Sequence, residues 1–318
     1  MIETVGLRKS FRTRSRGRGV VVEAVRGVDL AIAEGEVFGF LGPNGAGKTT
    51  TLRMLATLIE PDGGRAVVAG VDLRADPAEV RRRIGYVAQG GGTWEDATAG
   101  EELVMQGRMH GLPKVDSVRA AGQAVIAFGL ADFAERRCKT LSGGQRRRVD
   151  IALGVIHRPR VLFLDEPTAG LDPASRAQVW AEVRRLRAEG MTVFLTTHYL
   201  EEADALCDRV AIIDQGSIVA LGTPDELKRE VSGDVVTVGV NGAAPEAAKV
   251  LEGQPYLRRM EVRTEGGLRL YVDQGASAIP LILRALDGGG VELDGIELHR
   301  PSLDDVFLAK TGRSLAES

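Results

Sequence analysis

The sequence predicts an α/β fold in which helices flank a core of parallel strands. Three short apolar runs, residues 37–41, 161–164 and 192–197, support this prediction. Strands that are buried on both faces of a parallel sheet are apolar along their whole length, and these runs have that character. Helical sequence follows the first run, and a strand–helix alternation resumes around the other two.

Before this core, the N-terminal region predicts a small antiparallel sheet. Apolar segments in residues 2–11 and 20–32 are separated by glycines, as is typical of short strands. Between them, residues 12–19 carry Arg12, Arg14, Arg16 and Arg18 among serine, threonine and glycine. We expect a solvated loop there, with contact to anionic lipid or nucleic acid as the alternative.

The loop after the first core strand has the G-x-x-x-x-G-K-[ST] spacing of a phosphate-binding loop. Apolar residues at helical spacing follow it, so its context is strand, glycine loop and helix. Glycines let backbone N–H groups turn toward phosphates, and the helix adds partial positive charge. We expect Lys48 to reach the β- and γ-phosphates of a nucleotide and Thr49 to ligate Mg²⁺; an ordinary glycine turn is the alternative. The loop comprises Gly42, Pro43, Asn44, Gly45, Ala46, Gly47, Lys48, Thr49 and Thr50.

The rest of the chain predicts further organisation. Helix-rich sequence with charged faces occupies about residues 90–158, which indicates a helical subdomain inserted in the core. Residues 229–318 show the order β-α-β-β-α-β, which is typical of a small ferredoxin-like α+β domain. An irregular extension packed on the core is the alternative. We expect a nucleotide-binding domain at residues 1–228 and an accessory domain at 229–318.

Polar residues directly follow two of the core strands. Asp165 lies at the carboxyl end of a predicted strand, where open α/β sheets bind ligands, so we expect it to hold Mg²⁺ or its waters. Glu166 beside it can polarise a water that attacks the γ-phosphate. A helix N-cap is the alternative for this pair, and Pro167 argues against it. His198 ends another strand, and we expect it to sense the γ-phosphate rather than to be a structural hydrogen-bonder.

A second anion-binding helix N-terminus is predicted at residues 141–145, Leu-Ser-Gly-Gly-Gln. The arginine triplet 146–148 follows it. Consecutive residues on a helix are about 100° apart, so these three arginines cannot form one basic face. We expect them to lie on a solvated helix surface rather than to bind nucleic acid.

The composition of the chain excludes several classes of protein. Its 318 residues carry a net charge of only −3, which does not indicate a nucleic-acid partner. No apolar run approaches the ~18 residues of a membrane span, and no signal-peptide pattern is present. The two cysteines, Cys138 and Cys207, fit a reducing compartment. We expect a soluble, cytoplasmic protein.

Taken together, these motifs resemble the nucleotide-binding subunit of ABC transporters. The phosphate loop, Gln89, the Leu-Ser-Gly-Gly-Gln segment, Asp165-Glu166, residues 169–172 and His198 occur in the order of that family, and the resemblance covers residues 2–225. Residues 146–152 and 301–308 resemble the daunorubicin-resistance branch, which pairs a separate ATPase subunit with an ABC-2-type permease. The resemblance implies an ATPase core of the ABC type with antiparallel and helical subdomains.

The resemblance also implies roles for individual residues, with ATP and Mg²⁺ as ligands. Phe11 stacks on the adenine, and Gln89 contacts Mg²⁺ or the attacking water. The signature residues close on the γ-phosphate of ATP held by a second copy, and Asp172 lines that dimer interface. The signature residues are Ser142, Gly143, Gly144 and Gln145.

The function implied by the resemblance is ATP hydrolysis that powers an exporter of a drug, lipid or polysaccharide. Such a subunit works as a homodimer with two composite sites, docks on separately encoded permease subunits and is peripheral on the inner face of the membrane. The alternatives are a soluble ABC ATPase that acts on nucleic acid or the ribosome, and a regulatory module without a permease. Against the first, residues 89–141 are too short to hold an inserted coiled coil, and no nucleic acid is expected.

Overall fold

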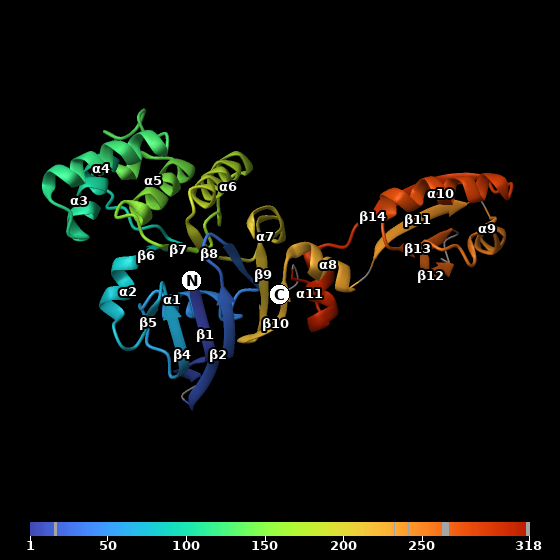
Figure 1. The fold of residues 1–318 in the computed structure, drawn as a ribbon, viewed down its shortest axis with the longest axis horizontal. Helices are drawn as coiled ribbons and strands as arrows, with labels where there is room; N and C mark the ends of the chain where they lie inside the picture. Colours follow the sequence, from blue (N-terminus) through green and yellow to red (C-terminus); the bar gives the residue numbers. More distant parts are fainter. Residues whose placement is uncertain (16–17, 232, 241, 263–266, 316–318) are drawn as a thin grey trace. The chain divides into compact units, whose positions relative to one another are not determined.

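The computed structural model describes residues 1–318 except 16–17, 232, 241, 263–266 and 316–318 (Figure 1). The described residues divide into two compact units, the first ending at Thr223 and the second beginning at Pro224. The predicted α/β class is confirmed. No helix among the described residues combines the length and the apolar character that a membrane span requires.

In the part of the chain that the structure describes, a six-stranded sheet forms the centre of the first unit. Its order is β10-β9-β3-β8-β7-β6, with parallel pairing from β9 to β6 and an antiparallel hairpin between β9 and β10. The three apolar runs are its buried strands β3, β7 and β8, as predicted. The bounds are β3 Val37–Leu41, β6 Ile84–Val87, β7 Val161–Asp165, β8 Thr192–Thr197, β9 Arg209–Asp214 and β10 Ser217–Gly222.

An aromatic cluster fixes the register of the three central strands. Phe194 on β8 lies between Phe38 and Phe40 of β3 on one side and Phe163 of β7 on the other, with ring centroids 5.6–5.8 Å apart. All four rings are fully buried. Because the strands are parallel, this packing holds their carboxyl ends at the same edge of the sheet.

The antiparallel sheet of the first unit has the order β2-β1-β4-β5. Its strands are β1 Ile2–Ser15, β2 Arg18–Ile32, β4 Gly63–Val68 and β5 Val71–Asp72. The prediction of a loop at residues 12–19 is wrong, because the hairpin ladder continues from Arg12 opposite Val21 to Ser15 opposite Arg18. Thr13 pairs with Val20 and Arg12 with Val21, and threonine and valine are both favoured in strands. Residues 16–17 of the predicted loop lie outside the described residues.

Helices cover the core sheet and form the inserted helical region, which is green in Figure 1. In the core they are α1 Lys48–Leu55, α2 Pro77–Arg83, α6 Pro173–Ala188 and α7 Leu200–Leu206. In the helical region they are α3 Ala99–Met109, α4 Lys114–Ala127 and α5 Gly143–Val155, with a short 3₁₀ turn at Cys138–Thr140. Helix α4 begins directly after the N-cap Pro113.

The second unit contains the predicted order β-α-β-β-α-β. Its sheet has the order β12-β13-β11-β14 with antiparallel pairing, which is the ferredoxin-like arrangement. Helices α8 and α11 flank this core and contact each other. The predicted boundary after residue 228 falls inside α8, and the independence of the two domains stays a prediction. The bounds are α8 Pro224–Val231, β11 Asp234–Val240, α9 Ala244–Leu251, β12 Leu257–Val262, β13 Leu268–Val272, α10 Gly275–Gly288, β14 Leu293–His299 and α11 Leu303–Thr311.

Removal of the second unit after Thr223 should leave a folded first unit, because the sheets of that unit are complete without it. We expect a fragment of residues 1–223 to unfold cooperatively, with a midpoint within ~4 °C of that of the same unit in the full chain. Thermal melts followed by circular dichroism measure this. The comparison fragment ends at Glu230 and exposes Leu227, which the full chain buries, so it should be less soluble. Aggregation of the shorter fragment would contradict the prediction.

Candidate nucleotide-binding and hydrolysis site

The phosphate-binding loop lies between β3 and α1, as its spacing predicts. Gly47, the N-cap of α1, has a φ of 103°, a conformation that favours glycine. A Cβ atom at this position would lie 2.3 Å from the carbonyl oxygen of Ala24 on β2. Glycine therefore allows the tight turn that brings the N-terminus of α1 to the end of β3, which is the arrangement that binds phosphate.

The side chain of Lys48 is folded over this loop and is only 4% exposed. Its Nζ donates to the carbonyl oxygens of Gly42 at 2.7 Å and Pro43 at 3.0 Å. The same Nζ lies 3.3 Å from Oε1 of Glu166. Burial lowers the pKa of Lys48, and the carboxylate of Glu166 opposes that shift. The ion pair joins the phosphate loop to the residue after β7.

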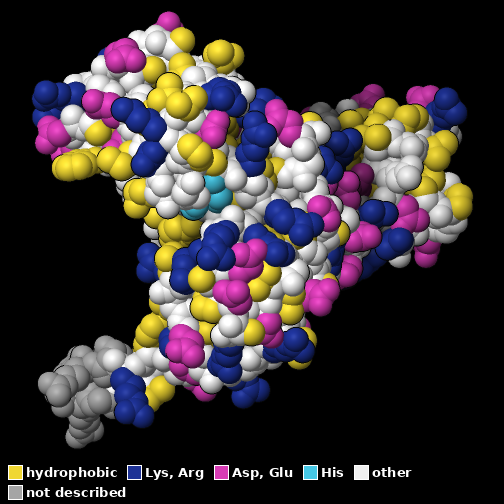
Figure 2. All heavy atoms as spheres, turned by 60° about the vertical axis from the view of Figure 1, so that its left-hand side comes forward, with side chains coloured by type: hydrophobic (Ala, Val, Ile, Leu, Met, Phe, Trp, Pro, Cys, Tyr) yellow, Lys and Arg dark blue, Asp and Glu magenta, His cyan; other side chains and the backbone are white. Residues whose placement is uncertain are grey.

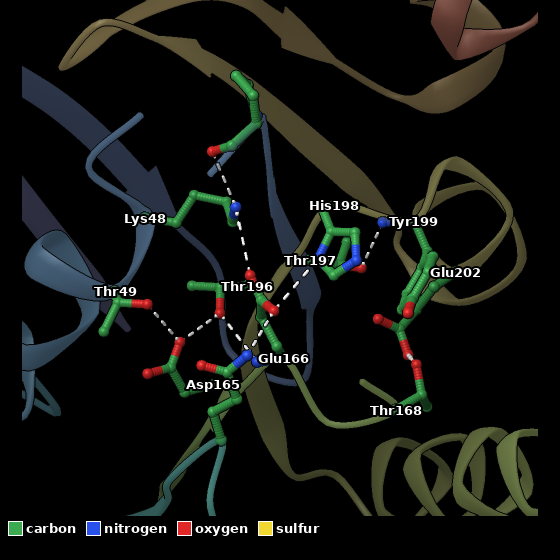
Figure 3. A network of polar contacts seen from close by, with 12 residues as sticks. Lys48, Thr49, Asp165, Glu166, Thr168, Thr196, Thr197, His198, Tyr199 and Glu202 are labelled. Atoms are coloured by element: carbon green, nitrogen blue, oxygen red, sulfur yellow. Dashed lines mark hydrogen bonds and ion pairs between the residues drawn. The ribbon is translucent and has the colours of Figure 1, made fainter. Parts of the chain in front are cut away.

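Asp165 ends β7 and faces the loop (Figure 3). Thr49 and Thr196 donate their hydroxyls to the same oxygen, Oδ1, at 2.9 and 2.7 Å. The other oxygen, Oδ2, is buried without a hydrogen-bond partner among the described residues. Buried acceptors are usually satisfied, so Oδ2 is the position where a cation or its water ligands would supply the partner.

The predicted site residues converge on Glu166, which is 7% exposed. Gln89 donates Nε2–H to Oε2 at 2.9 Å, and Nδ1 of His198 lies 3.2 Å from the same oxygen without hydrogen-bond alignment. The backbone of Glu166 has a φ of 44°, which is uncommon for a residue with a side chain. Its N–H donates to Oγ1 of Thr196 at 3.0 Å. Backbone strain of this kind is concentrated at functional sites.

Lys48, Gln89 and Glu166 border an open cleft of about 310 Å³, which is in the size range of small-molecule sites, whereas Asp165 and His198 are not among the residues that line it. Phe11 of β1 also borders it, and its ring is 41% exposed and available for stacking. Of the predicted loop residues, Gly42, Pro43 and Ala46 are buried and do not line the cleft. The lining residues are Phe11, Ala24, Asn44, Gly45, Gly47, Lys48, Thr49, Thr50, Gln89 and Glu166.

The signature residues are at a different place, at the N-terminus of α5. Ser142 is the N-cap, and it forms a capping box in which its hydroxyl accepts the N–H of Gln145 at 3.2 Å while Oε1 of Gln145 accepts the N–H of Ser142 at 3.0 Å. Ser142 and Gly143 are exposed to solvent. None of the four signature residues is among those that line the cleft.

Asp172, the predicted interface residue, is close to the signature through Ser175. It caps α6 by accepting the N–H and the hydroxyl of Ser175 at 2.9 and 2.7 Å. These hydrogen bonds lower the pKa of Asp172. Ser175 in turn packs against Gly144, where an added Cβ would lie 2.3 Å from its Oγ. The structure thus gathers the site residues into two sets, the cleft and this exposed surface.

The prediction that the arginine triplet is a solvated surface is wrong for its middle member. Arg147 is 5% exposed, and its guanidinium donates to three backbone carbonyls around the site. The signal was present in the sequence, since Arg147 lies three residues after Gly144 and four before Ile151, both of which are buried. That spacing places all three on the inner face of the helix.

Glu202 is a second polar residue that the sequence did not single out. It is fully buried on α7, and its Oε1 accepts the Thr168 hydroxyl at 2.7 Å and the Trp180 indole N–H at 3.1 Å. Burial raises the pKa of Glu202, and hydrogen bonds from Thr197, Thr168 and Trp180 oppose this. It thereby connects Thr168, in the loop after Glu166, to Trp180 of α6; the contact with Thr168 is drawn in Figure 3. No motif in the sequence marks this residue.

Comparisons with protein families give matches to both units. Residues 25–169 match the family described as ABC transporter. Residues 222–311 match the family described as ATP-binding protein DrrA1-3-like, C-terminal domain.

Curated relatives align along almost the whole chain. The daunorubicin resistance ATP-binding protein DrrA2 of Streptomyces coeruleorubidus is 47% identical over 91% of this chain and 90% of its own length. The linearmycin resistance ATP-binding protein of Bacillus subtilis is 34% identical over 92% of this chain and 95% of its own length. The Nod factor export ATP-binding protein I of Rhizobium sp. is 36% identical over 99% of this chain and 98% of its own length.

Solved structures with the same fold include ABC cassettes. A dimeric bacterial ABC transporter cassette superimposes with a TM-score of 0.63 at 26% identity, covering 70% of this chain and 98% of that one. An ATP-binding subunit of an ABC transporter gives a TM-score of 0.62 at 26% identity, covering 72% and 92%.

Replacement of Glu166 by glutamine should separate nucleotide binding from hydrolysis. Glutamine keeps the shape of the side chain but cannot accept a proton, so we expect ATP to bind with nearly unchanged Kd while kcat falls at least ~100-fold. Phosphate release and equilibrium ATP binding measure the two effects. Glu34→Gln is the control, because Glu34 is exposed and pairs only at 3.5 Å with Arg160. Normal turnover by Glu166→Gln would refute the prediction that Glu166 accepts a proton from the attacking water.

Proposed function

We infer the function of this chain from its family, because it belongs to the ABC transporters as an ATP-binding protein of the daunorubicin-resistance type. It is an ATPase, and we propose that it powers the export of a drug, lipid or polysaccharide through a membrane partner. The names of its relatives concern resistance to daunorubicin or linearmycin and export of Nod factor. A soluble ATPase that acts on nucleic acid or the ribosome is not favoured by these relatives.

One observation carries the hydrolytic mechanism, namely the convergence of Gln89, Lys48 and His198 on the carboxylate of Glu166. In the proposed reaction water attacks the γ-phosphorus of ATP, and the bond to the β–γ bridging oxygen breaks to give ADP and phosphate. Glu166 takes a proton from the water, which Gln89 helps to orient. Lys48 and His198 stabilise negative charge on the phosphate oxygens.

We propose Mg²⁺ as the cation of this site. The donors that would hold it are Oγ1 of Thr49 and the carboxylate of Asp165, with the amide oxygen of Gln89 beside them. Magnesium prefers oxygen ligands and usually takes only one or two from the protein, with waters and phosphate oxygens completing its shell. The unpartnered Oδ2 of Asp165 fits this arrangement. When bound, the ion would neutralise charge on the β- and γ-phosphates.

The separation of the two sets of site residues supports a homodimer. Ser142, Gly143 and Asp172 lie outside the cleft that contains Lys48, so one chain does not close its own site. We propose that the signature of one copy covers the ATP held by the other, which gives two composite sites. Two solved ABC cassettes with the same fold are dimers. Dimer closure on ATP and opening after hydrolysis would then drive the membrane partner.

A groove in the helical region supports docking on a permease. It encloses about 860 Å³ between α3 and α4. Among the residues that line it, the side chains of Trp94, Met105 and Val118 are 70%, 57% and 52% exposed, respectively. In Figure 2 hydrophobic side chains lie among charged ones at the top of the view. An exposed apolar groove of this size fits the apolar face of a helix. We assign it to a segment of a separate ABC-2-type permease, which would hold the ATPase on the inner face of the membrane.

Substitution of Ser142 by arginine should block dimer closure without affecting the cleft. We expect ATPase activity to fall by about 100-fold, because the donors at the helix end no longer reach the phosphate, while ATP still binds to the single chain. Activity assays and equilibrium ATP binding test this. Ser277→Arg places the same bulk on an exposed position of α10 as a control. If Ser142→Arg abolishes ATP binding instead, the role across the dimer is wrong.

Substitution of Met105 by glutamate should release the protein from its membrane partner. A charge inside the groove disrupts apolar docking, so we expect the membrane-bound fraction in native cells to fall at least ~10-fold with ATPase activity of the free subunit retained. Met109→Glu is the matched control, since Met109 is on the same helix, is 76% exposed and does not line the groove. Equal membrane binding by both variants would contradict the docking site.

A further inference from the structure

Arg147 makes an unusual set of contacts for a buried arginine. Its Nε donates to the carbonyl oxygen of Pro167 at 2.7 Å, Nη1 to that of Ala88 at 2.7 Å, and Nη2 to that of Asp165 at 3.2 Å. The side chain is 5% exposed. All three acceptors are backbone groups, so the guanidinium fixes the course of the chain rather than one side chain.

These carbonyls flank the two residues that we assign to the chemistry of hydrolysis. Asp165 and Pro167 are the residues immediately before and after Glu166, and Ala88 immediately precedes Gln89. Glu166 has the unusual φ of 44°, which persists only where the surroundings hold it. A planar guanidinium can bond several acceptors in a fixed geometry, whereas a lysine ammonium is a flexible point charge.

A second residue of the same helix contacts the loop after Gln89. Asp150, one turn beyond Arg147, is 5% exposed, and its Oδ1 accepts the N–H of Gly92 at 3.1 Å. The inner face of α5 thus holds the Gln89 loop at two points. Charged groups buried in this way are costly and are weak evidence for stability, so a role in fixing one arrangement is the better explanation.

The helix that carries Arg147 also begins with the signature. Arg147 is five positions after Ser142, which is about 7.5 Å along the helix axis at 1.5 Å per residue. A helix is stiff over that distance. Any displacement of its N-terminus would therefore reach the peptide units beside Glu166 and Gln89 through the three hydrogen bonds of Arg147.

We propose that Arg147 is a positioning residue for hydrolysis. It aligns Glu166 with Gln89 in the site of its own chain, and it links that alignment to the position of the signature at the start of the same helix. This inference rests on the proposed roles of Glu166 and Gln89. It assigns to Arg147 no contact with ATP, so its loss should affect turnover and leave nucleotide binding intact.

The test compares Arg147→Met and Arg147→Lys in the full chain. A misplacement of catalytic groups by about 1 Å costs up to ~100-fold in rate. We expect kcat for ATP to fall roughly 30- to 100-fold in Arg147→Met with KM and Kd for ATP within about threefold of wild type, and Arg147→Lys to recover part of the loss. The effect of Arg147→Met should also shrink strongly when it is combined with Glu166→Gln, because both act on one step.

Arg148→Met is the matched control, with the same change in charge on the same helix. The hydrogen bond of Arg148 to the Gly129 carbonyl and its cation–π contact with Phe133 both lie in the helical region, so we expect its variant to keep wild-type kcat. A wild-type kcat in Arg147→Met would overturn the proposal. If Arg147→Met instead loses both cooperative unfolding and ATP binding, Arg147 is needed for folding, and the proposal is overturned as well. Normal turnover by Glu166→Gln would instead refute the proposed function itself.

Discussion

The buried ion pair between Lys48 and Glu166 is the interaction on which the site depends. Both side chains are more than nine-tenths buried, and a charge in such surroundings persists only with a partner. The pair can form because parallel strands bring the loop after β3 and the residue after β7 to one edge of the sheet. Between them, β8 supplies Thr196, which bonds both the Asp165 carboxylate and the backbone of Glu166. Mispairing in the sheet would separate the charges, so the fold and the site are coupled.

Much of this arrangement could be predicted because it follows from local sequence. The strands β3, β7 and β8 are apolar along their length, and the carboxyl ends of parallel strands lie at one edge of the sheet. The sequence therefore predicts that Lys48, Asp165 and His198, which follow or end these strands, lie close together. The alternation of elements in the second unit was equally readable, and it predicted the ferredoxin-like sheet. The family comparisons agree with the motifs that carried the resemblance. The individual roles of the site residues stay predictions.

The features that the sequence did not predict depend on contacts between distant segments. Arg147 was placed at the surface because a charged residue in a helix is usually solvated. Its burial is possible only because carbonyls of residues 88, 165 and 167 converge on one point. Glu202 depends in the same way on Thr168 and Trp180. The strands of the β1–β2 hairpin were predicted, but residues 12–19 at its end were expected to form a loop because arginines alternate there with threonine, serine and glycine.

The capping box at Ser142 has a consequence for what the start of α5 can recognise. The Ser142 hydroxyl already accepts the N–H of Gln145, and the Gln145 side-chain oxygen is engaged with the backbone. The remaining hydroxyl hydrogen and the N–H groups at the exposed helix end are donors, which a negatively charged oxygen complements well. In the proposed dimer such a surface would measure the length of the phosphate chain opposite it. In that dimer a triphosphate would reach these donors, whereas a diphosphate would be one group too short and would leave them to water.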